Sequence, residues 1–217
     1  MINILFEDKF IIVCEKPQGV LSEWHERQKN MPDLLKKQSK AFKISVIHRL
    51  DKPVGGVMVF SKHPKATANL AKAVQNHQLT KEYYAVVKGK PQPDSGVFED
   101  ILFRDSKNNK SYVVKTLRKG AKPAKLSYKL IDTVDSPEGV LSLVKVKLFT
   151  GRTHQIRVQF ASRKLPLLGD EKYGGKSAKC DISLWSAHLK FSHPVLFSDI
   201  DITLLPPQKY PWNLFKI

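Results

Sequence analysis

Short apolar runs separated by polar turns recur along most of the chain. From Lys81 to Val87 the side chains alternate with a period of two, which places Tyr83 on one face of a strand and Tyr84 on the other. The segment from Val140 to Phe149 alternates in the same way, and Val57 to Phe60 is a compact run typical of a buried strand. Strands joined through short polar turns favour antiparallel pairing, so the sequence predicts a central, mostly antiparallel sheet.

Other segments predict further strands and the helices that flank this sheet. Asn3 to Cys14 is typical of two strands with a turn between them, and Leu126 to Leu130 of one more strand. Three helices are predicted from prolines and apolar stripes: a short one near Pro32, one from Pro64 to about Gln78, and one within Thr150 to Lys164. The expected fold class is therefore mixed α/β, of the α+β type.

Length and charge restrict the kind of protein this is. With 217 residues and 41% hydrophobic content, the chain can bury a sizeable core as one domain over residues 1–217, or as two closely packed lobes. A formal net charge of +17 favours a polyanionic partner, and nucleic acid is preferred over an anionic membrane surface. No apolar stretch reaches the roughly 20 residues of a membrane span, and the start is unlike a signal peptide. We therefore expect a cytoplasmic protein.

The segment His48 to Gly56 contains the leading candidate for a catalytic carboxylate. Asp51 lies between Arg49 and Lys52, and such cationic neighbours favour the charged form of a carboxylate. The two glycines that follow allow the backbone to approach a ligand closely. Asp51 is thus suited to act as a nucleophile or a base. On these residues alone, a surface aspartate in a solvated turn is the alternative.

Four blocks, in order along the chain, together resemble one enzyme family. They are His48-Arg-Leu-Asp51, Lys81-Glu-Tyr-Tyr-Ala-Val-Val-Lys-Gly89, Gly151-Arg-Thr-His-Gln-Ile-Arg157 and Pro166-Leu-Leu-Gly-Asp-Glu-Lys-Tyr-Gly174. Two further segments match the family pattern more weakly, at Glu15-Lys-Pro-Gln-Gly19 and from Leu184 to Pro194. The set resembles the RluA class of pseudouridine synthases over nearly the whole chain. Relatives often carry an accessory N-terminal RNA-binding domain, and we expect a catalytic domain without one here.

The resemblance implies a fold, a reaction and roles for three residues. It implies two sub-lobes around an active-site cleft, and isomerisation of uridines in ribosomal or transfer RNA by a monomer without metal or cofactor. Asp51 would attack the sugar or take a proton from C2′, and both remain open. Arg157 would hold the Asp51 carboxylate in a two-point contact. Tyr83 would stack on the base and assist proton removal from C5.

The polar residues of two of the blocks are candidates for binding the substrate RNA. These are Arg49, His48, Arg152, His154 and Gln155. Arg49 is the candidate for filling the space that a flipped uridine leaves. For His154 a hydrogen-bonded structural role is the alternative, and a metal site is not expected because no other ligand residues lie near it in the sequence.

Two other functions and one departure from the family pattern are to be weighed. A basic RNA-binding protein without catalysis would not require Asp51, Tyr83 and Arg157 together, and a hydrolase would require a nucleophile that the sequence does not offer. The family usually has Thr-Ser-Gly where this chain has Val54-Gly-Gly56. The basic segment from Asp94 to Lys125 fits a mobile flap, an RNA-facing hairpin or a solvated loop. The RNA target is not specified.

Overall fold

The structure is a computed structural model that describes residues 1–177 and 179–217. The chain divides into two compact units. Unit 1 contains Met1–Lys81 and Trp185–Leu205, and unit 2 contains Glu82–Leu184 and Pro206–Ile217. Two units agree with the expectation of two lobes. One catalytic domain with a cleft between the lobes stays a prediction.

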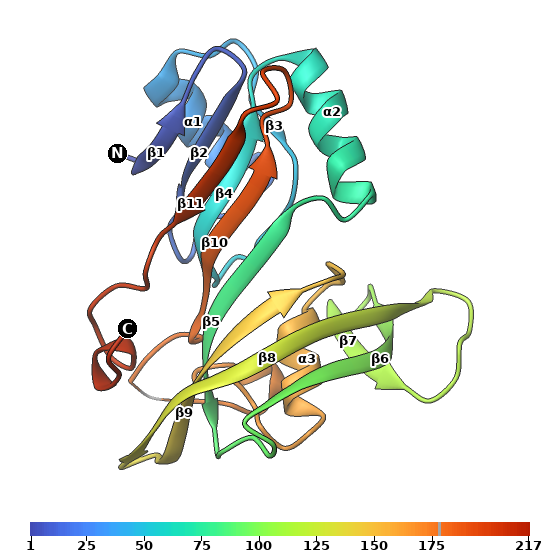
Figure 1. Cartoon of the computed structure of the whole chain (residues 1–217), viewed down its shortest axis with the longest axis vertical. Helices are drawn as coiled ribbons and strands as arrows, with labels where there is room; N and C mark the ends of the chain where they lie inside the picture. Colours follow the sequence, from blue (N-terminus) through green and yellow to red (C-terminus); the bar gives the residue numbers. More distant parts are fainter. Residues whose placement is uncertain (178) are drawn as a thin grey trace. The chain divides into compact units, whose positions relative to one another are not determined.

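Unit 1 is built on a sheet with mostly antiparallel pairing. Its strands follow in the order β1 (Ile4–Glu7), β2 (Ile11–Lys16), β4 (Gly55–Ser61) and β10 (Leu184–Ser192), while β3 (Ser45–Val46) pairs with β4 and β11 (Asp199–Thr203) with β10 (Figure 1). The pairing of β4 with β10 is parallel, and that of β2 with β4 is antiparallel. Every residue of β4 is buried, which confirms the interpretation of Val57 to Phe60 as an interior strand.

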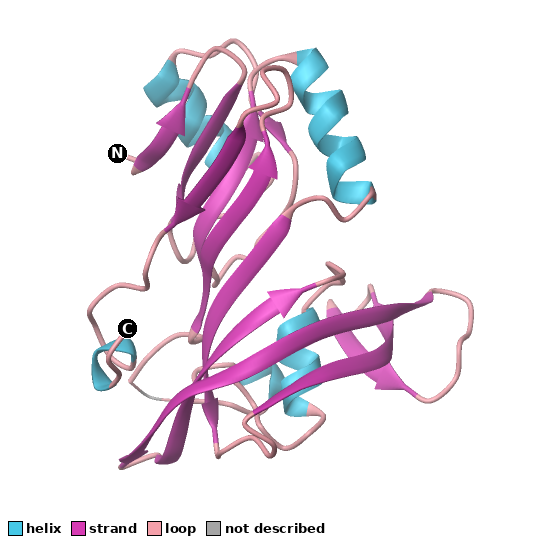
Figure 2. Cartoon of the chain, viewed as in Figure 1, coloured by secondary structure: helices cyan, strands magenta, loops and turns pink. Residues whose placement is uncertain are grey.

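Two helices complete unit 1 (Figure 2). Helix α1 (Met31–Ser39) begins after Asn30, whose side-chain oxygen accepts a hydrogen bond from the Asp33 backbone N–H at 3.0 Å. Helix α2 (Pro64–Gln75) packs Ala66 and Leu70 against apolar residues of the sheet. Both helices have proline in the first turn, as the sequence predicts.

Unit 2 contains a second run of strands and one short helix. The strand order is β5 (Thr80–Lys88), β9 (Gly139–Leu148), β8 (Ala121–Ser136), β6 (Ser95–Asp105) and β7 (Lys110–Val114). Helix α3 (Gln155–Ala161) places Phe160 edge-on against Phe98, with ring centroids 5.1 Å apart. Short 3-10 turns lie at Glu171–Tyr173 and Trp212–Leu214. This packing holds α3, and so the Arg157 that it carries, against the sheet.

The structure selects among the expectations for one segment and corrects another. Between Asp94 and Lys125 it forms a hairpin of β6 and β7 and the start of β8, which agrees with the hairpin among the three alternatives, and contact of this hairpin with RNA stays a prediction. The predicted helix within Thr150 to Lys164 extends only over Gln155–Ala161, because His154 before it has the left-handed φ of 55°. Thr153 therefore lies outside the helix, whereas Ile156, Arg157 and Phe160 lie within it at spacings that place them on one face.

Candidate active site

Asp51 lies in unit 1, on a loop whose backbone is fixed on both sides of it. The Ser22 hydroxyl donates to the Leu50 carbonyl at 2.7 Å and accepts from the Leu50 N–H at 3.0 Å. On the other side, the Gly19 N–H donates to the Lys52 carbonyl at 2.9 Å. Asp51 itself is half-buried. The loop therefore presents a carboxylate from a rigid backbone, as a catalytic group requires.

A fully buried lysine, Lys16, contacts the backbone of this loop. It belongs to the weaker family match at Glu15 to Gly19, from which its role could not be predicted. The Lys16 ammonium donates to the carbonyls of Val20 at 2.7 Å, Pro17 at 2.9 Å and Lys52 at 3.2 Å. Burial lowers the pKa of Lys16 to about 7, and the negative charge of Asp51 opposes this shift. Lys16 thus joins the segment Pro17 to Val20 to the Asp51 loop through the hydrogen bonds of one amino group.

The two neighbours that were expected to bind RNA with Asp51 have different environments. The Val59 N–H donates to Nε2 of His48 at 3.3 Å. Burial, and secondarily the charge of Lys81, lowers the pKa of His48 to about 3, so the ring is neutral at physiological pH. A neutral ring that accepts from the backbone supports the loop. Arg49 is exposed and pairs with Glu23 at 2.9 Å, where a phosphate can reach it.

After Asp51 the chain has Val54-Gly-Gly56 where the family usually has Thr-Ser-Gly, and contacts in unit 1 leave little room for a side chain at position 55. A Cβ on Gly55 would overlap Cζ3 of Trp185 and lie 3.0 Å from Cε3 of the same indole. Gly56 has φ of 117°, and a Cβ there would lie 2.6 Å from the Ser186 backbone nitrogen. The indole therefore occupies the space in which a serine at position 55 would begin.

We predict that Gly55→Ser destabilises the protein because it overpacks this contact. The expected loss is about 1–3 kcal/mol in the free energy of unfolding, measured as a lower urea midpoint. Trp185→Leu also destabilises, by leaving a cavity. The double variant should lose less than the sum of the two single losses, since the leucine gives the serine room. Additive losses would show that the indole does not exclude a side chain at position 55.

The buried Lys16 predicts a pH dependence of stability. Its pKa is about 7 in the folded chain and 10.5 as the ordinary value, so between these pH values the unfolded chain binds more protons. The contribution of Lys16 to stability therefore rises with pH across this window. Relative to a Lys16→Met variant, the wild-type free energy of unfolding should gain up to about 1.4 kcal/mol per pH unit. Urea unfolding of both proteins at pH 7, 8 and 9 measures this; parallel profiles would show that Lys16 stays charged throughout.

Arg157 and Tyr83 lie in unit 2, and both are buried. Arg157 makes a two-point contact with Asp170, from Nε to Oδ2 at 2.8 Å and from Nη2 to Oδ1 at 2.8 Å. The sequence analysis expected Arg157 to make a two-point contact with Asp51. In unit 2 the guanidinium of Arg157 makes such a contact with Asp170. A bidentate contact fixes the guanidinium plane, so Asp170 positions Arg157.

A tyrosine that sequence reasoning did not select extends this group. The Tyr173 ring lies 5.3 Å from Cζ of Arg157, and its hydroxyl accepts from the Ser111 N–H at 2.7 Å and lies 2.9 Å from Nδ1 of His154. Burial raises the pKa of Tyr173, which keeps the hydroxyl protonated. This hydrogen bond agrees with the structural role that was considered for His154, and contact with RNA stays a prediction for it. The signal in the sequence was the Tyr of the Pro166 to Gly174 block.

Gln155 and Arg152 brace the turn that leads into α3. Oε1 of Gln155 accepts from the Thr150 hydroxyl at 2.8 Å and from the Arg152 N–H at 3.0 Å, and Nε2 donates to the Lys125 carbonyl at 3.1 Å. Nε of Arg152 donates to the Pro123 carbonyl at 2.9 Å. Gln155 is buried and Arg152 is half-buried. In the structure both therefore support the turn, and contact with RNA stays a prediction for them.

Neither a cluster of metal ligands nor a helix able to span a membrane occurs among the described residues. Within 1–177 and 179–217, no three or more His, Cys, Asp or Glu side chains gather where they could hold a metal ion. In the same part of the chain, every helix is too short or too polar to cross a bilayer. Cys14 and Cys180 are free thiols.

Comparison with known proteins places the chain in a family. A family model described as RNA pseudouridylate synthase matches residues 10–162, more than half of the chain. An uncharacterized RNA pseudouridine synthase of Aquifex aeolicus is 36% identical over 89% of this chain, and the match spans 66% of that relative. The dual-specificity RNA pseudouridine synthase RluA of Vibrio vulnificus is 33% identical over 88% of this chain and 78% of its own.

Solved structures agree on the fold. Human RNA pseudouridylate synthase domain containing 4 has a TM-score of 0.78 at 23% identity, and the match covers 98% of this chain and 91% of that one. In sequence the chain spans about two thirds of the Aquifex relative and 60% of ribosomal large subunit pseudouridine synthase D of Borreliella burgdorferi, which is 34% identical over 87% of this chain. The fold is thus the pseudouridine synthase fold, and the chain belongs to the RluA family of RNA pseudouridine synthases.

Proposed function

We propose that this protein converts specific uridines of ribosomal or transfer RNA to pseudouridine, with Asp51 as the catalytic carboxylate. The reaction breaks the bond between uracil N1 and ribose C1′, rotates the held base and joins C5 to C1′. Atoms and electrons balance without an oxidant or an energy source. The chemistry therefore asks only for a carboxylate, groups that hold the base, and a site that admits an unstacked nucleotide.

The arrangement around Asp51 is the observation that carries the proposal. Hydrogen bonds at Leu50 and Lys52 fix the backbone on either side of this half-buried carboxylate. Its negative charge acts on the buried Lys16, whose pKa it raises against the effect of burial. A charged, oriented carboxylate is the species that can attack the sugar or take a proton from C2′.

The family resemblance supports roles for two residues of unit 2. Arg157 is proposed to orient the Asp51 carboxylate, and Tyr83 to stack on the uracil ring. The contact with Asp170 supports the first role, because an arginine already fixed along one edge loses little freedom when its remaining N–H groups bind a second carboxylate. A monomer acting in the cytoplasm is the form that we expect, and both points stay predictions.

Mapping of pseudouridine in total RNA tests the proposal. RNA from the source organism is compared with RNA from a strain lacking the gene, complemented by wild type or by Asp51→Ala. We expect one or a few sites to disappear and to return only with wild type, which would also name the RNA. A map that is unchanged on deletion would favour an RNA-binding protein without catalysis.

A further inference from the structure

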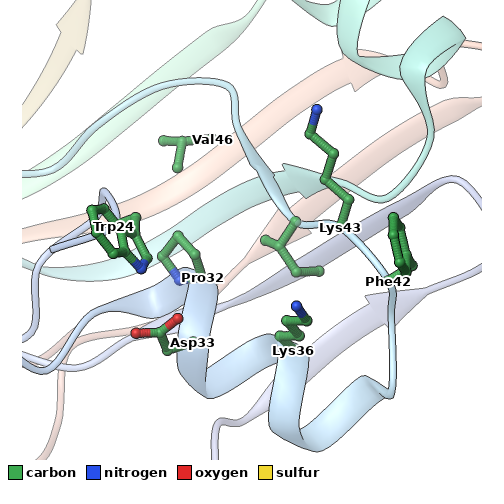
Figure 3. Close-up of a pocket in the computed structure, with 8 residues that line it drawn as sticks. Trp24, Pro32, Asp33, Lys36, Phe42, Lys43 and Val46 are labelled. Carbon is green, nitrogen blue, oxygen red and sulfur yellow. The ribbon is translucent and has the colours of Figure 1, made fainter. Parts of the chain in front are cut away.

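A shallow pocket in unit 1 lies outside the proposed active site. It has a volume of about 310 Å³ and is formed by the loop before α1, by α1 itself and by the segment that follows it. Figure 3 shows Trp24 beside Pro32 at one end and Phe42 at the other, with Lys36 and Lys43 nearer Phe42. Pockets that bind small ligands begin at about 300 Å³, so this one suits a single nucleotide.

The two aromatic side chains of the pocket are unusually open to solvent. Trp24 is 65% exposed and Phe42 is 95% exposed. Neither side chain therefore contributes much to the core, although burial of such rings is what normally stabilises a fold. Exposed aromatic faces are the surfaces on which unpaired bases stack in proteins that bind single-stranded nucleic acid.

The charge around the pocket suits a polyanion. From Glu23 to Lys43 there are six Lys or Arg residues, Lys43 included, against three Asp or Glu residues. Of the acidic ones, Glu23 is already paired with Arg49, while Lys36 and Lys43 lie exposed on the pocket wall. Asp33 also lines the pocket, and its carboxylate suits the N–H groups of a base more than a phosphate.

The loop that carries Trp24 is joined to the Asp51 loop at three places. Ser22 bonds to the backbone of Leu50, as described above. Glu23 pairs with Arg49 at 2.9 Å, and the Lys52 ammonium donates to Oε1 of Gln28 at 2.9 Å. Whatever binds against Trp24 is therefore held by the same local structure that presents Asp51.

From these observations we infer that the pocket binds an unpaired nucleotide of the substrate RNA, near the reacting uridine in the RNA chain. Its base contacts both Trp24 and Phe42, and its phosphates lie at Lys36 and Lys43. The inference rests on the proposed function in that the RNA is the substrate. A second protein or a second copy of this chain is disfavoured because the rim is basic and the protein already carries a formal net charge of +17.

Binding of defined oligoribonucleotides tests the pocket without knowledge of the natural target. The full chain is titrated with single-stranded decauridylate and decaadenylate, and with a ten-base-pair RNA duplex. Trp24 is the exposed tryptophan of the described part of the chain, since Trp185 and Trp212 are buried, so its fluorescence should be quenched by the single strands. Trp24→Ala and Phe42→Ala should each weaken single-strand binding about tenfold, and Trp24→Phe should keep it within about threefold.

Matched variants control for exposure and charge. Phe197 is 77% exposed in the same unit and far from the pocket in sequence, and Phe197→Ala should bind as wild type. Lys36→Gln with Lys43→Gln should lower the slope of log Kd against log salt, by about 0.7 for each phosphate that is no longer neutralised, whereas Lys72→Gln on α2 should not. Unchanged single-strand affinity in Trp24→Ala and Phe42→Ala would overturn the inference, as would dimerisation that depends on Trp24.

Activity measurements separate this inference from the proposed function. On RNA from the strain lacking the gene, Trp24→Ala should raise KM about tenfold with kcat kept, because it removes an interaction made equally before and during reaction. If the wild type is active and Trp24→Ala has the same KM and kcat, the binding role of the pocket is refuted and the proposed function is retained. If the wild type is inactive but its affinity for RNA falls in Trp24→Ala, the proposed function is refuted and the binding role of the pocket is retained.

Discussion

Asp51→Asn is expected to remove turnover while leaving RNA affinity within about threefold. Asparagine has the shape of aspartate and keeps the backbone contacts at Leu50 and Lys52, but it can neither attack the sugar nor accept a proton. We expect kcat to fall at least about 1,000-fold, the size of effect seen when a group that reacts directly is removed. Release of tritium from RNA labelled at uracil C5 measures kcat, and filter binding measures affinity.

The matched control for this variant is Asp199→Asn. It also removes one negative charge from unit 1, but Asp199 is exposed on β11 and pairs only at the surface with Lys190. It should keep full activity. If Asp51→Asn instead loses much of its RNA affinity and keeps residual turnover, Asp51 acts in RNA binding or folding and not in the chemical step. The same variant should also lower the pKa of Lys16 further, since the charge that opposes the shift is gone.

Asp170→Asn is expected to cost about 3–5 kcal/mol in the free energy of unfolding. The ion pair between Arg157 and Asp170 is almost completely buried, and removal of the Asp170 charge weakens both of its contacts with the guanidinium inside the protein. Urea unfolding followed by circular dichroism measures the loss. Replacement of both residues, as Arg157→Met with Asp170→Leu, should recover much of the stability because apolar side chains then replace both charges of this pair.

An exposed ion pair in the same unit provides the comparison. Glu99 pairs with Lys125 at 2.6 Å, with both side chains about half exposed or more. Glu99→Gln should therefore cost no more than about 1 kcal/mol. A loss below that value in Asp170→Asn would mean that water or another group compensates Arg157. Under the proposed function, the stable double variant should still be inactive, which separates the role of Arg157 in catalysis from its role in folding.

The sequence predicted those parts of the fold that depend on local pattern. The strand at Val57 to Phe60 and the helix from Pro64 are confirmed, since apolar periodicity and a proline at the first turn act over neighbouring residues. The hairpin between Asp94 and Lys125 was one of several interpretations. Its strands expose many polar side chains and interrupt the alternation with turn formers, so the pattern of a half-buried sheet is weak there.

The environments of the site residues were harder to predict because they depend on contacts distant in sequence. A lysine is rarely fully buried, so nothing local indicated that Lys16 would donate to three carbonyls. The contact of Arg157 with Asp170 joins a helix to a later loop, and Gln155 turns inward to Lys125 across 30 positions. The sequence motifs identify these residues as candidates, but their contacts become visible only in the structure.

The contact between Gly55 and Trp185 restricts the order in which such a chain can have changed. A serine at position 55, usual in the family, would overlap the present indole at an expected cost of about 1–3 kcal/mol in the free energy of unfolding. A single-step path from serine at position 55 to the present pair avoids this cost if glycine is substituted before tryptophan. The residue at position 185 therefore influences which substitutions are tolerated at position 55, beside Asp51.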